Sequence, residues 1–324
     1  MRIVAVSRIL DEADIIEAFV RHTAAYVDHH IFIDNKSFDG TVEILHALKE
    51  EGFKITVFSN SSPFCNEKDY NTNLYKLAIN DHKADWVIFL DADEFIDDRK
   101  IDVGFCGVLQ RIPSMISCVR VRLTSYVATT RDNGSEPLIT SRVRFRRDPG
   151  EVFKVIVRGN LLDRSVKVLD GNHGVEIDGG RACPWHDELS LTYAHFAERS
   201  LPQTIAKFTR GWAKALAAGP KCIERGTSIH YKEPFRIFRD RPRDLIEFRD
   251  FAIYNSLGGL IEDPIIYRGT ALRYTPSVDE EARAVRMMMG YLEKLARHHG
   301  LLLDASPEAR ALAEQWAAAW VKVL

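Results

Sequence analysis

Cysteines are few in this chain and follow no pattern. Five occur among 324 residues, an odd number, and they are widely scattered. A disulfide framework needs an even, closely organised set, and a structural zinc site needs closely spaced pairs. The sequence therefore excludes both and favours free thiols in a reducing compartment, which predicts a cytoplasmic protein. The five positions are Cys65, Cys106, Cys118, Cys183 and Cys222.

Long apolar runs and an excess of one charge are also missing. No apolar stretch reaches membrane-spanning length, and the first residues lack the zones of a signal peptide. The formal net charge is only -2, so no global field attracts nucleic acid or an anionic membrane. These absences predict a globular protein with no membrane span and no nucleic-acid partner.

What is present in residues 1–95 is a regular alternation of strand and helix patterns. Short apolar runs at 3–6, 31–33, 55–58 and 86–90 are separated by segments with helical spacing of apolar residues. Strands separated by helices of this length indicate βαβ units. We therefore predict an α/β fold with a mainly parallel sheet.

The pattern changes after residue 95. Apolar and polar residues alternate around 119–123, 142–146 and 153–158, which predicts antiparallel or mixed strands added to the first sheet. We place one domain at 1–219, with halves at 1–95 and 96–219, and a mostly helical extension at 220–324. An apolar stripe on the last helix predicts docking on the body or on another subunit, and so a possible homo-oligomer; it comprises Leu312, Trp316, Trp320 and Val323.

Three acidic residues follow the most apolar of the predicted strands. Residues 86–90 are all apolar, as in a strand covered on both faces, and Asp91, Asp93 and Glu94 come directly after them. Unpaired buried carboxylates are costly, so a partner should neutralise them. Ligands of open α/β sheets bind outside the carboxyl ends of the strands. The pattern therefore indicates a site for Mn²⁺ or Mg²⁺ with a diphosphate, although an exposed turn or helix cap would also explain the acidic residues.

Polar clusters also follow the other three strands of the first half. Short polar side chains at these positions can bind a base and ribose, but they are equally typical of turns and helix N-caps. Their shared position at one sheet edge favours a ligand site. The clusters are Ser7 and Arg8; Asp34, Asn35 and Asp39; and Ser59 and Asn60.

Several of these segments resemble the family 2 glycosyltransferases. The stretches SRILDEADIIEAFVRHTAAYVDHHIFIDNKSFDGTVEIL and ADWVIFLDADEF are similar to that family, and closest to its branch that resembles family 92 (DUF23-like) enzymes. KVIVRG, DGNHGV and YAHFAERS with TIAKFTRGW extend the resemblance to about residue 215. It implies a GT-A fold, a nucleotide-diphosphate sugar donor, here a UDP-sugar, and a divalent metal. The chain departs from the branch at Asp11, where Asn is usual before Glu12.

The resemblance also implies roles for individual residues. Asp93 would bind the metal directly, and Asp91 would contact the metal or the ribose. His195 is the first candidate for a further metal ligand and His173 the second, although either can be a structural histidine. The remaining candidates would contact the donor: Ser7, Arg8, Glu12, Asp34, Asn35, Asp39 and Lys154, the last of which can also lie on a solvated strand face.

The expected activity is transfer of a sugar to a glycan or lipid-linked acceptor, with a carboxylate as general base. Asp187 and Glu188 are favoured as the base, and Glu94 is either the base or a support for the metal. One alternative is a sugar-nucleotide nucleotidyltransferase, which would need a glycine-rich loop after the first strand, where this chain has no glycine. Another is a non-catalytic nucleotide- or glycan-binding module on the same scaffold.

Overall fold

The structure is a computed structural model of the whole chain. It describes all residues except 64–66, 130, 225, 227, 243–258, 276–278 and 319–324. Of the predicted C-terminal stripe, Trp320 and Val323 lie outside the described residues.

The first half of the chain forms the predicted parallel βαβ layer. Its strands lie in the order β3-β2-β1-β4, and neighbouring strands are parallel. β4 lies between β1 and β8, which explains why residues 86–90 are at most 1 % exposed. The elements are β1 (Ile3–Ile9), α1 (Ile16–Thr23), β2 (His29–Asp34), α2 (Thr41–Glu51), β3 (Ile55–Ser59), α3 (Glu67–Asn80) and β4 (Trp86–Phe89).

The second half adds antiparallel strands beside β4. β8 runs antiparallel to both β4 and β6, and the long strand β12 is parallel to β6 and antiparallel to β5. The elements are β5 (Glu94–Asp97), α4 (Gly104–Arg111), β6 (Cys118–Val127), α5 (Ile139–Arg142), β7 (Phe145–Arg146), β8 (Phe153–Arg158), β9 (Lys167–Val168), β10 (Val175–Ile177), β11 (Arg181–Ala182) and β12 (Trp185–Glu198). Short 3-10 turns lie at η1 (Leu162–Arg164) and η2 (Asp170–Asn172).

These elements confirm the predicted α/β class with a mainly parallel sheet and added antiparallel strands. The strand predicted at 142–146 is wrong in extent: Arg142 ends the short helix α5, and only Phe145 and Arg146 form a strand, β7. Backbone N–H groups of residues 141–143 donate to carbonyls three or four residues earlier, which closes a helical turn there.

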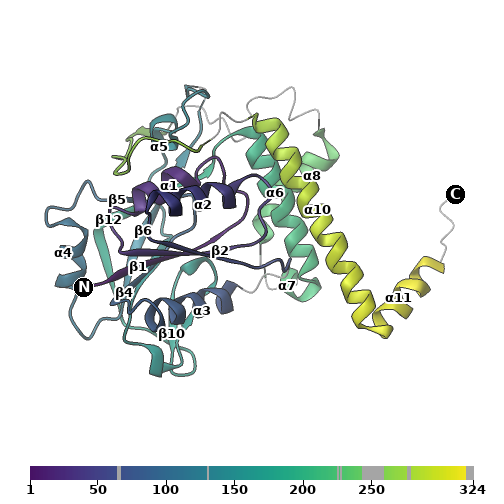
Figure 1. Ribbon diagram of the computed structural model, residues 1–324, viewed down its shortest axis with the longest axis horizontal. Helices are drawn as coiled ribbons and strands as arrows, with labels where there is room; N and C mark the ends of the chain where they lie inside the picture. Colours follow the sequence, from purple (N-terminus) through teal and green to yellow (C-terminus); the bar gives the residue numbers. More distant parts are fainter. Residues whose placement is uncertain are drawn as a thin grey trace.

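Helices and a small sheet cover the two faces of the large sheet (Figure 1), and an apolar core lies under each layer. Helices α1 and α2 lie on one face and contribute Phe19 and Leu45 to the larger core. Helix α3 and the small sheet β9–β11 lie on the other face, where Tyr75 and Val168 are fully buried. Both faces are thus closed, which leaves the strand ends as the place for a ligand.

The C-terminal part is mostly helical, as predicted, and packs on the sheet domain. α10 lies along α6, and Arg283 on α10 pairs with Asp14 at 3.2 Å and with Asp39 at 3.0 Å. In the described part of the chain, no helix is both long and apolar enough to cross a membrane. The elements are α6 (Leu201–Ala217), α7 (Pro220–Glu224), η3 (Ile229–Tyr231), α8 (Lys232–Asp240), β13 (Ile261–Glu262), α10 (Glu280–Ala305) and α11 (Pro307–Ala318).

Candidate functional site

The turn between β4 and β5 carries the three acidic residues. The Glu94 N–H donates to the Asp91 carbonyl at 3.0 Å, and the Asp91 N–H donates to Glu94 Oε2 at 3.1 Å. Asp93 is 5 % exposed and Glu94 1 %, whereas the Asp91 side chain keeps 34 % of its surface. The turn therefore holds one carboxylate toward solvent and two inside the protein.

His195 lies opposite this turn because of strand register. β5 and β12 are antiparallel, and Glu94 is paired with His195. His195 Nε2 lies 3.6 Å from Asp93 Oδ1, and one ligand atom each from Asp93, Glu94 and His195 lie within 4.8 Å of one another. It is the one such group of three in the residues that the structure describes. Two carboxylates and an imidazole suit Mn²⁺ well and Mg²⁺ adequately.

Two lysines neutralise these carboxylates, Lys154, which is buried, and Lys207, which is partly exposed. Lys154 Nζ lies 2.7 Å from Asp91 Oδ2 and 2.8 Å from Glu94 Oε1, and Lys207 Nζ lies 2.7 Å from Asp93 Oδ2. Burial opposes the charge on Asp93, but Lys207 and His195 hold its pKa well below the usual value. Burial raises the pKa of Glu94 to about 7, although Lys154 acts against this. The chain itself thus supplies part of the neutralisation that the sequence alone assigned to a metal.

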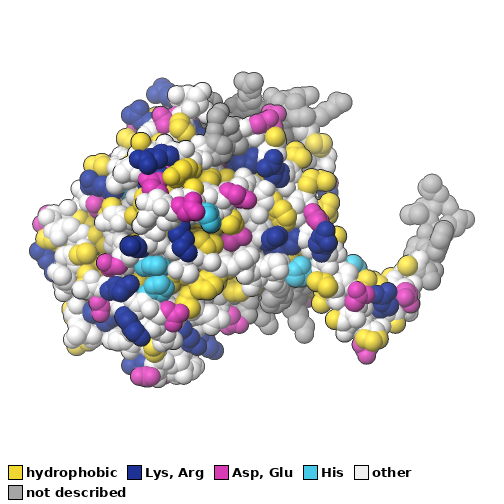
Figure 2. Space-filling model, viewed as in Figure 1, with side chains coloured by type: hydrophobic (Ala, Val, Ile, Leu, Met, Phe, Trp, Pro, Cys, Tyr) yellow, Lys and Arg dark blue, Asp and Glu magenta, His cyan; other side chains and the backbone are white. Residues whose placement is uncertain are grey.

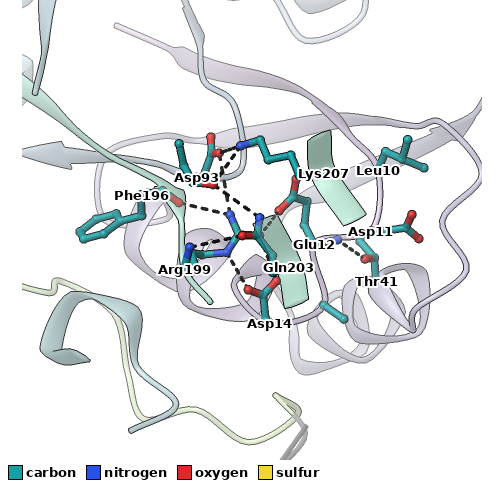
Figure 3. Close-up of polar contacts among 12 residues, drawn as sticks. Leu10, Asp11, Glu12, Asp14, Thr41, Asp93, Phe196, Arg199, Gln203 and Lys207 are labelled. Carbon is teal, nitrogen blue, oxygen red and sulfur yellow. Dashed lines mark hydrogen bonds and ion pairs between the residues drawn. The ribbon is translucent and has the colours of Figure 1, made fainter. Parts of the chain in front are cut away.

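Arg199, directly after β12, joins this site to the loop that follows β1 (Figure 3). Its Nε donates to Asp14 at 2.6 Å, its Nη2 donates to Glu12 at 2.6 Å, and its Nη1 lies 3.8 Å from Asp93 Oδ2. Burial opposes ionisation of Asp14, but Arg199 and Arg283 hold its pKa well below the usual range. Burial also raises the pKa of Glu12 to about 7, with Asp93 adding to the rise and Arg199 opposing it.

Sequence reasoning did not select Arg199, Lys207 or Glu198, although all three lie at this site. Burial raises the pKa of Glu198, and the charges of Lys207 and His195 act on it. A register irregularity between His195 and Glu198 interrupts the regular strand there, and such a bulge can re-aim a side chain. The sequence could have indicated them, because four ionisable residues lie close together in the segments AHFAERS and TIAKF: His195, Glu198, Arg199 and Lys207.

The polar residues after β2 hold the loop in place. Asp34 accepts from the Ser37 hydroxyl at 2.5 Å, and Asp39 accepts from the Thr41 hydroxyl at 2.6 Å and the Ala13 N–H at 3.0 Å. These contacts are the turn and N-cap chemistry that the sequence left open as an alternative.

Asn35 is also held by neighbouring groups. Its Nδ2 donates to the carbonyls of Asn60 and Ser62 at 2.8 and 2.9 Å, and Lys294 Nζ donates to its Oδ1 at 2.8 Å. Both atoms of the Asn35 amide therefore have protein partners, and one partner comes from the C-terminal helix α10.

The residues after β1 separate into two environments. The Ser7 hydroxyl is buried and lies 2.8 Å from His30 Nε2, inside the sheet domain. Arg8 Nη1 lies 3.1 Å from Glu67 Oε1, and its charge also acts on Asp91. The structure therefore brings Arg8 toward the acidic turn and keeps Ser7 away from it.

Asp187 and Glu188 lie at the opposite edge of the sheet. They belong to the first residues of β12, paired in register with the beginning of β6, whereas His195 is near the end of β12. Asp187 is paired with Arg120 and His195 with Ser125, so five residues of β6 at about 3.3 Å each put roughly 17 Å between them. Arg120 donates to Asp187 at 2.6 and 2.8 Å. The structure does not bring these two carboxylates to the acidic turn.

His173 is exposed and is held by the backbone. Its Nδ1 lies 2.8 Å from the carbonyl of Phe153, next to Lys154 in β8. It is not in the group formed by Asp93, Glu94 and His195. Of the two histidines predicted as metal ligands, the structure places only His195 beside both acidic residues.

Solved glycosyltransferases show weak structural similarity to this chain. The mannosyltransferase PcManGT from Pyrobaculum calidifontis, in complex with GDP-Man and Mn²⁺, has a TM-score of 0.38 and 14 % identity over 90 % of this chain and 87 % of its own. Glucosyl-3-phosphoglycerate synthase from Mycobacterium tuberculosis, with Mg²⁺ and UDP, has a TM-score of 0.34 and 17 % identity over 66 % and 79 %. TM-scores below 0.5 give these similarities no weight for the substrate of this chain.

Sequence comparison gives a more direct result. No curated protein matches the chain. Residues 9–154 match the family described as Glycosyl transferase family 2. This range is a little under half of the chain and includes the acidic turn and Lys154. The chain therefore contains a region with the sequence features of glycosyl transferase family 2.

Proposed function

We propose that this protein is a metal-dependent glycosyltransferase. It moves a sugar from a nucleotide-diphosphate sugar, specifically a UDP-sugar, to a hydroxyl of a glycan or lipid-linked acceptor. The observation that carries the proposal is the group formed by Asp93, Glu94 and His195 at the carboxyl edge of the parallel strands, with its two carboxylates inside the family-matching range. The family 92-like branch and a cytoplasmic location, for which the free thiols of Cys106, Cys118 and Cys183 are support, belong to the same proposal.

The donor set suits a divalent cation with oxygen and nitrogen ligands. Asp93, Glu94 and His195 would hold it, and Lys207 would give up its contact with Asp93. When bound, such a cation supplies charge stabilisation to a diphosphate leaving group. Asp91, the most exposed of the three acidic residues, and Arg8 are the proposed contacts of the donor.

The protein's own residues prepare this site. Lys154 fixes Asp91 and Glu94 through two short contacts, and Arg199 fixes Glu12 beside Asp93. For the base that accepts the proton of the acceptor hydroxyl, we propose Glu198 in place of Asp187 and Glu188. Glu198 lies three residues beyond His195 at the end of β12, past the bulge, and burial raises the pKa of its carboxyl, which favours proton uptake.

A non-catalytic nucleotide-binding module is a second candidate function. Lys154 and Lys207 already neutralise much of the acidic turn, which reduces its need for a metal. A module of this kind binds the nucleotide sugar without consuming it, which distinguishes it from a transferase.

The test combines thermal shift and turnover. Wild type should show a melting temperature raised by UDP-sugar together with Mn²⁺, since binding to the folded state stabilises it. Asp93→Asn should lose the metal-dependent part of this shift, whereas Asp102→Asn, an exposed aspartate outside the site, should keep it. UDP release that depends on an acceptor supports the transferase, and binding without release supports the module. An unchanged metal-dependent shift in Asp93→Asn contradicts both.

The proposal also includes self-association through the C-terminal helices. Large apolar side chains remain exposed on α10 and α11, among them Met289 at 61 % and Trp316 at 68 %. Such surfaces on a globular protein usually mark contacts with a partner.

A further inference from the structure

Helix α10 has two apolar faces, and only one is used within the chain. The inner face packs on α6 and the sheet domain with Arg283, Met287, Gly290 and Lys294, all buried. A side chain at Gly290 would clash with the ring of Phe38, with contacts as short as 2.3 Å. The inner face therefore fixes how α10 is rotated on the body.

The outer face of α10 carries a regular apolar stripe. Val285, Met289, Leu292 and Ala296 follow one another at spacings of four, three and four residues, and all four are exposed. At 100° per residue this stripe lies on the side of the helix opposite to the inner face. Val285 is 55 % exposed, and Met289 and Leu292 are each 61 % exposed. Spacing of three and four residues is the pattern by which one helix packs along another.

The flanks of this outer stripe differ from each other. On one side lie Arg286 and Glu293, one heptad apart and opposite in charge. On the other side lie Met288 and Leu295, both half-buried. Glu293 pairs with Arg297 on its own helix, whereas Arg286 has no ion pair with any residue that the structure describes. When two copies of this flank run antiparallel, the Arg286 end of one copy therefore lies against the Glu293 end of the other.

From this pattern we infer that the outer stripe of α10 pairs antiparallel with the same stripe of a second copy of the chain. The inference deepens the proposed self-association and does not depend on the transferase activity. A twofold axis between Met289 and Leu292 sets Met289 against Leu292 of the partner subunit and Val285 against Ala296 of the partner subunit. The same axis brings Arg286 close to Glu293 of the partner subunit, and each contact occurs twice, as a twofold interface requires.

The last turns of α10 carry further exposed apolar side chains. In Figure 1 its last turns and α11 extend away from the sheet domain, and Figure 2 shows hydrophobic side chains along this edge of the molecule. Leu301 and Leu302 are 63 % and 64 % exposed. They do not belong to the stripe formed by Val285, Met289, Leu292 and Ala296. At 100° per residue both lie more than 90° around the helix from the outer stripe, so this pairing leaves them exposed.

The first experiment measures mass in solution by light scattering over a range of protein concentrations. Wild type should approach twice 36.9 kDa, and Met289→Asp with Leu292→Asp should give a single chain of 36.9 kDa. Met115→Asp is the matched control, because Met115 is a 79 % exposed methionine elsewhere, and it should stay dimeric. Circular dichroism of each variant shows that the fold is retained. A wild type that is monomeric at every concentration overturns the inference.

The second experiment tests orientation. Arg286→Glu alone and Glu293→Arg alone should each weaken the dimer, and the two changes together should restore it, because the pair is exchanged across the axis. Val285→Cys with Ala296→Cys should form an intersubunit disulfide on oxidation, whereas Val285→Cys alone should not, beyond the background of the native cysteines. A dimer that ignores the charge exchange and cross-links through Val285→Cys alone contradicts the antiparallel register. That result leaves self-association and the transferase proposal standing.

Discussion

The two edges of the sheet hold ion pairs with similar geometry in opposite environments. At the carboxyl edge, Arg199 contacts Asp14 at 2.6 Å with side chains 1 % and 5 % exposed. At the amino edge, Arg120 contacts Asp187 at the same distance, with side chains 29 % and 39 % exposed. Water screens the second pair and not the first. Equal distances therefore carry different energies, and only the buried pair lies where a ligand is expected.

The comparison also explains how the carboxyl edge tolerates so many acids. Asp91, Asp93, Glu94, Glu12 and Asp14 are close together, and each has a cation within 2.8 Å. Those cations come from β8, α6 and the end of β12, which are far apart in sequence. The arrangement stabilises a dense acidic cluster that can exchange one lysine for a metal.

The largest effect is expected from removing the buried cation. Arg199→Met should lower the free energy of unfolding by about 3–5 kcal/mol, because it leaves Asp14 and Glu12 buried without their partner. Urea denaturation at neutral pH measures this. Arg120→Met at the other edge is the matched change and should cost about 0–1 kcal/mol. Equal losses at the two edges would contradict the comparison.

A smaller effect is expected from acid. The pKa of Asp14 is lower in the folded protein than the usual value of about 3.9, so its pair contributes stability above that pH and loses it as the pH falls. The stability advantage of wild type over Asp14→Asn should shrink by about 2 kcal/mol or more between neutral pH and strong acid. Urea midpoints measured across this range give the difference. Asp187→Asn should show a smaller change, and a larger one there would reverse the assignment of the two edges.

The smallest effect is expected at the amino edge itself. Asp187→Ala and Glu188→Ala should each change stability by about 0–1 kcal/mol, because both side chains are partly exposed. Each should also leave sugar transfer within about twofold of wild type, a ratio worth less than the 1.4 kcal/mol of a tenfold change. Steady-state rates, compared with Glu198→Ala, test this. Loss of transfer in Asp187→Ala would restore that residue as the candidate base.

Much of the fold could be predicted from local pattern. The apolar run at 86–90 is a central strand because nothing but the interior suits it, and helical spacing located α1 and α2 to within a few residues. The strand expected at 142–146 is only the two-residue β7, because alternation over so few residues does not exclude a helical turn at its start. For the site, the sequence named the residues at the strand end together with Lys154 and His195 from distant elements, which lie beside them, and did not name Lys207 or Arg199.

The sequence by itself determined the α/β alternation and the acidic turn after β4, since both follow from the order of apolar and polar residues along a short stretch. Only the tertiary structure decided what surrounds that turn. The antiparallel register of β5 and β12 sets His195 opposite Glu94, and the packing of α6 brings Lys207 to Asp93. The same register leaves Asp187 at the far edge. Strand register and helix packing depend on contacts between distant segments, and a local pattern does not contain them.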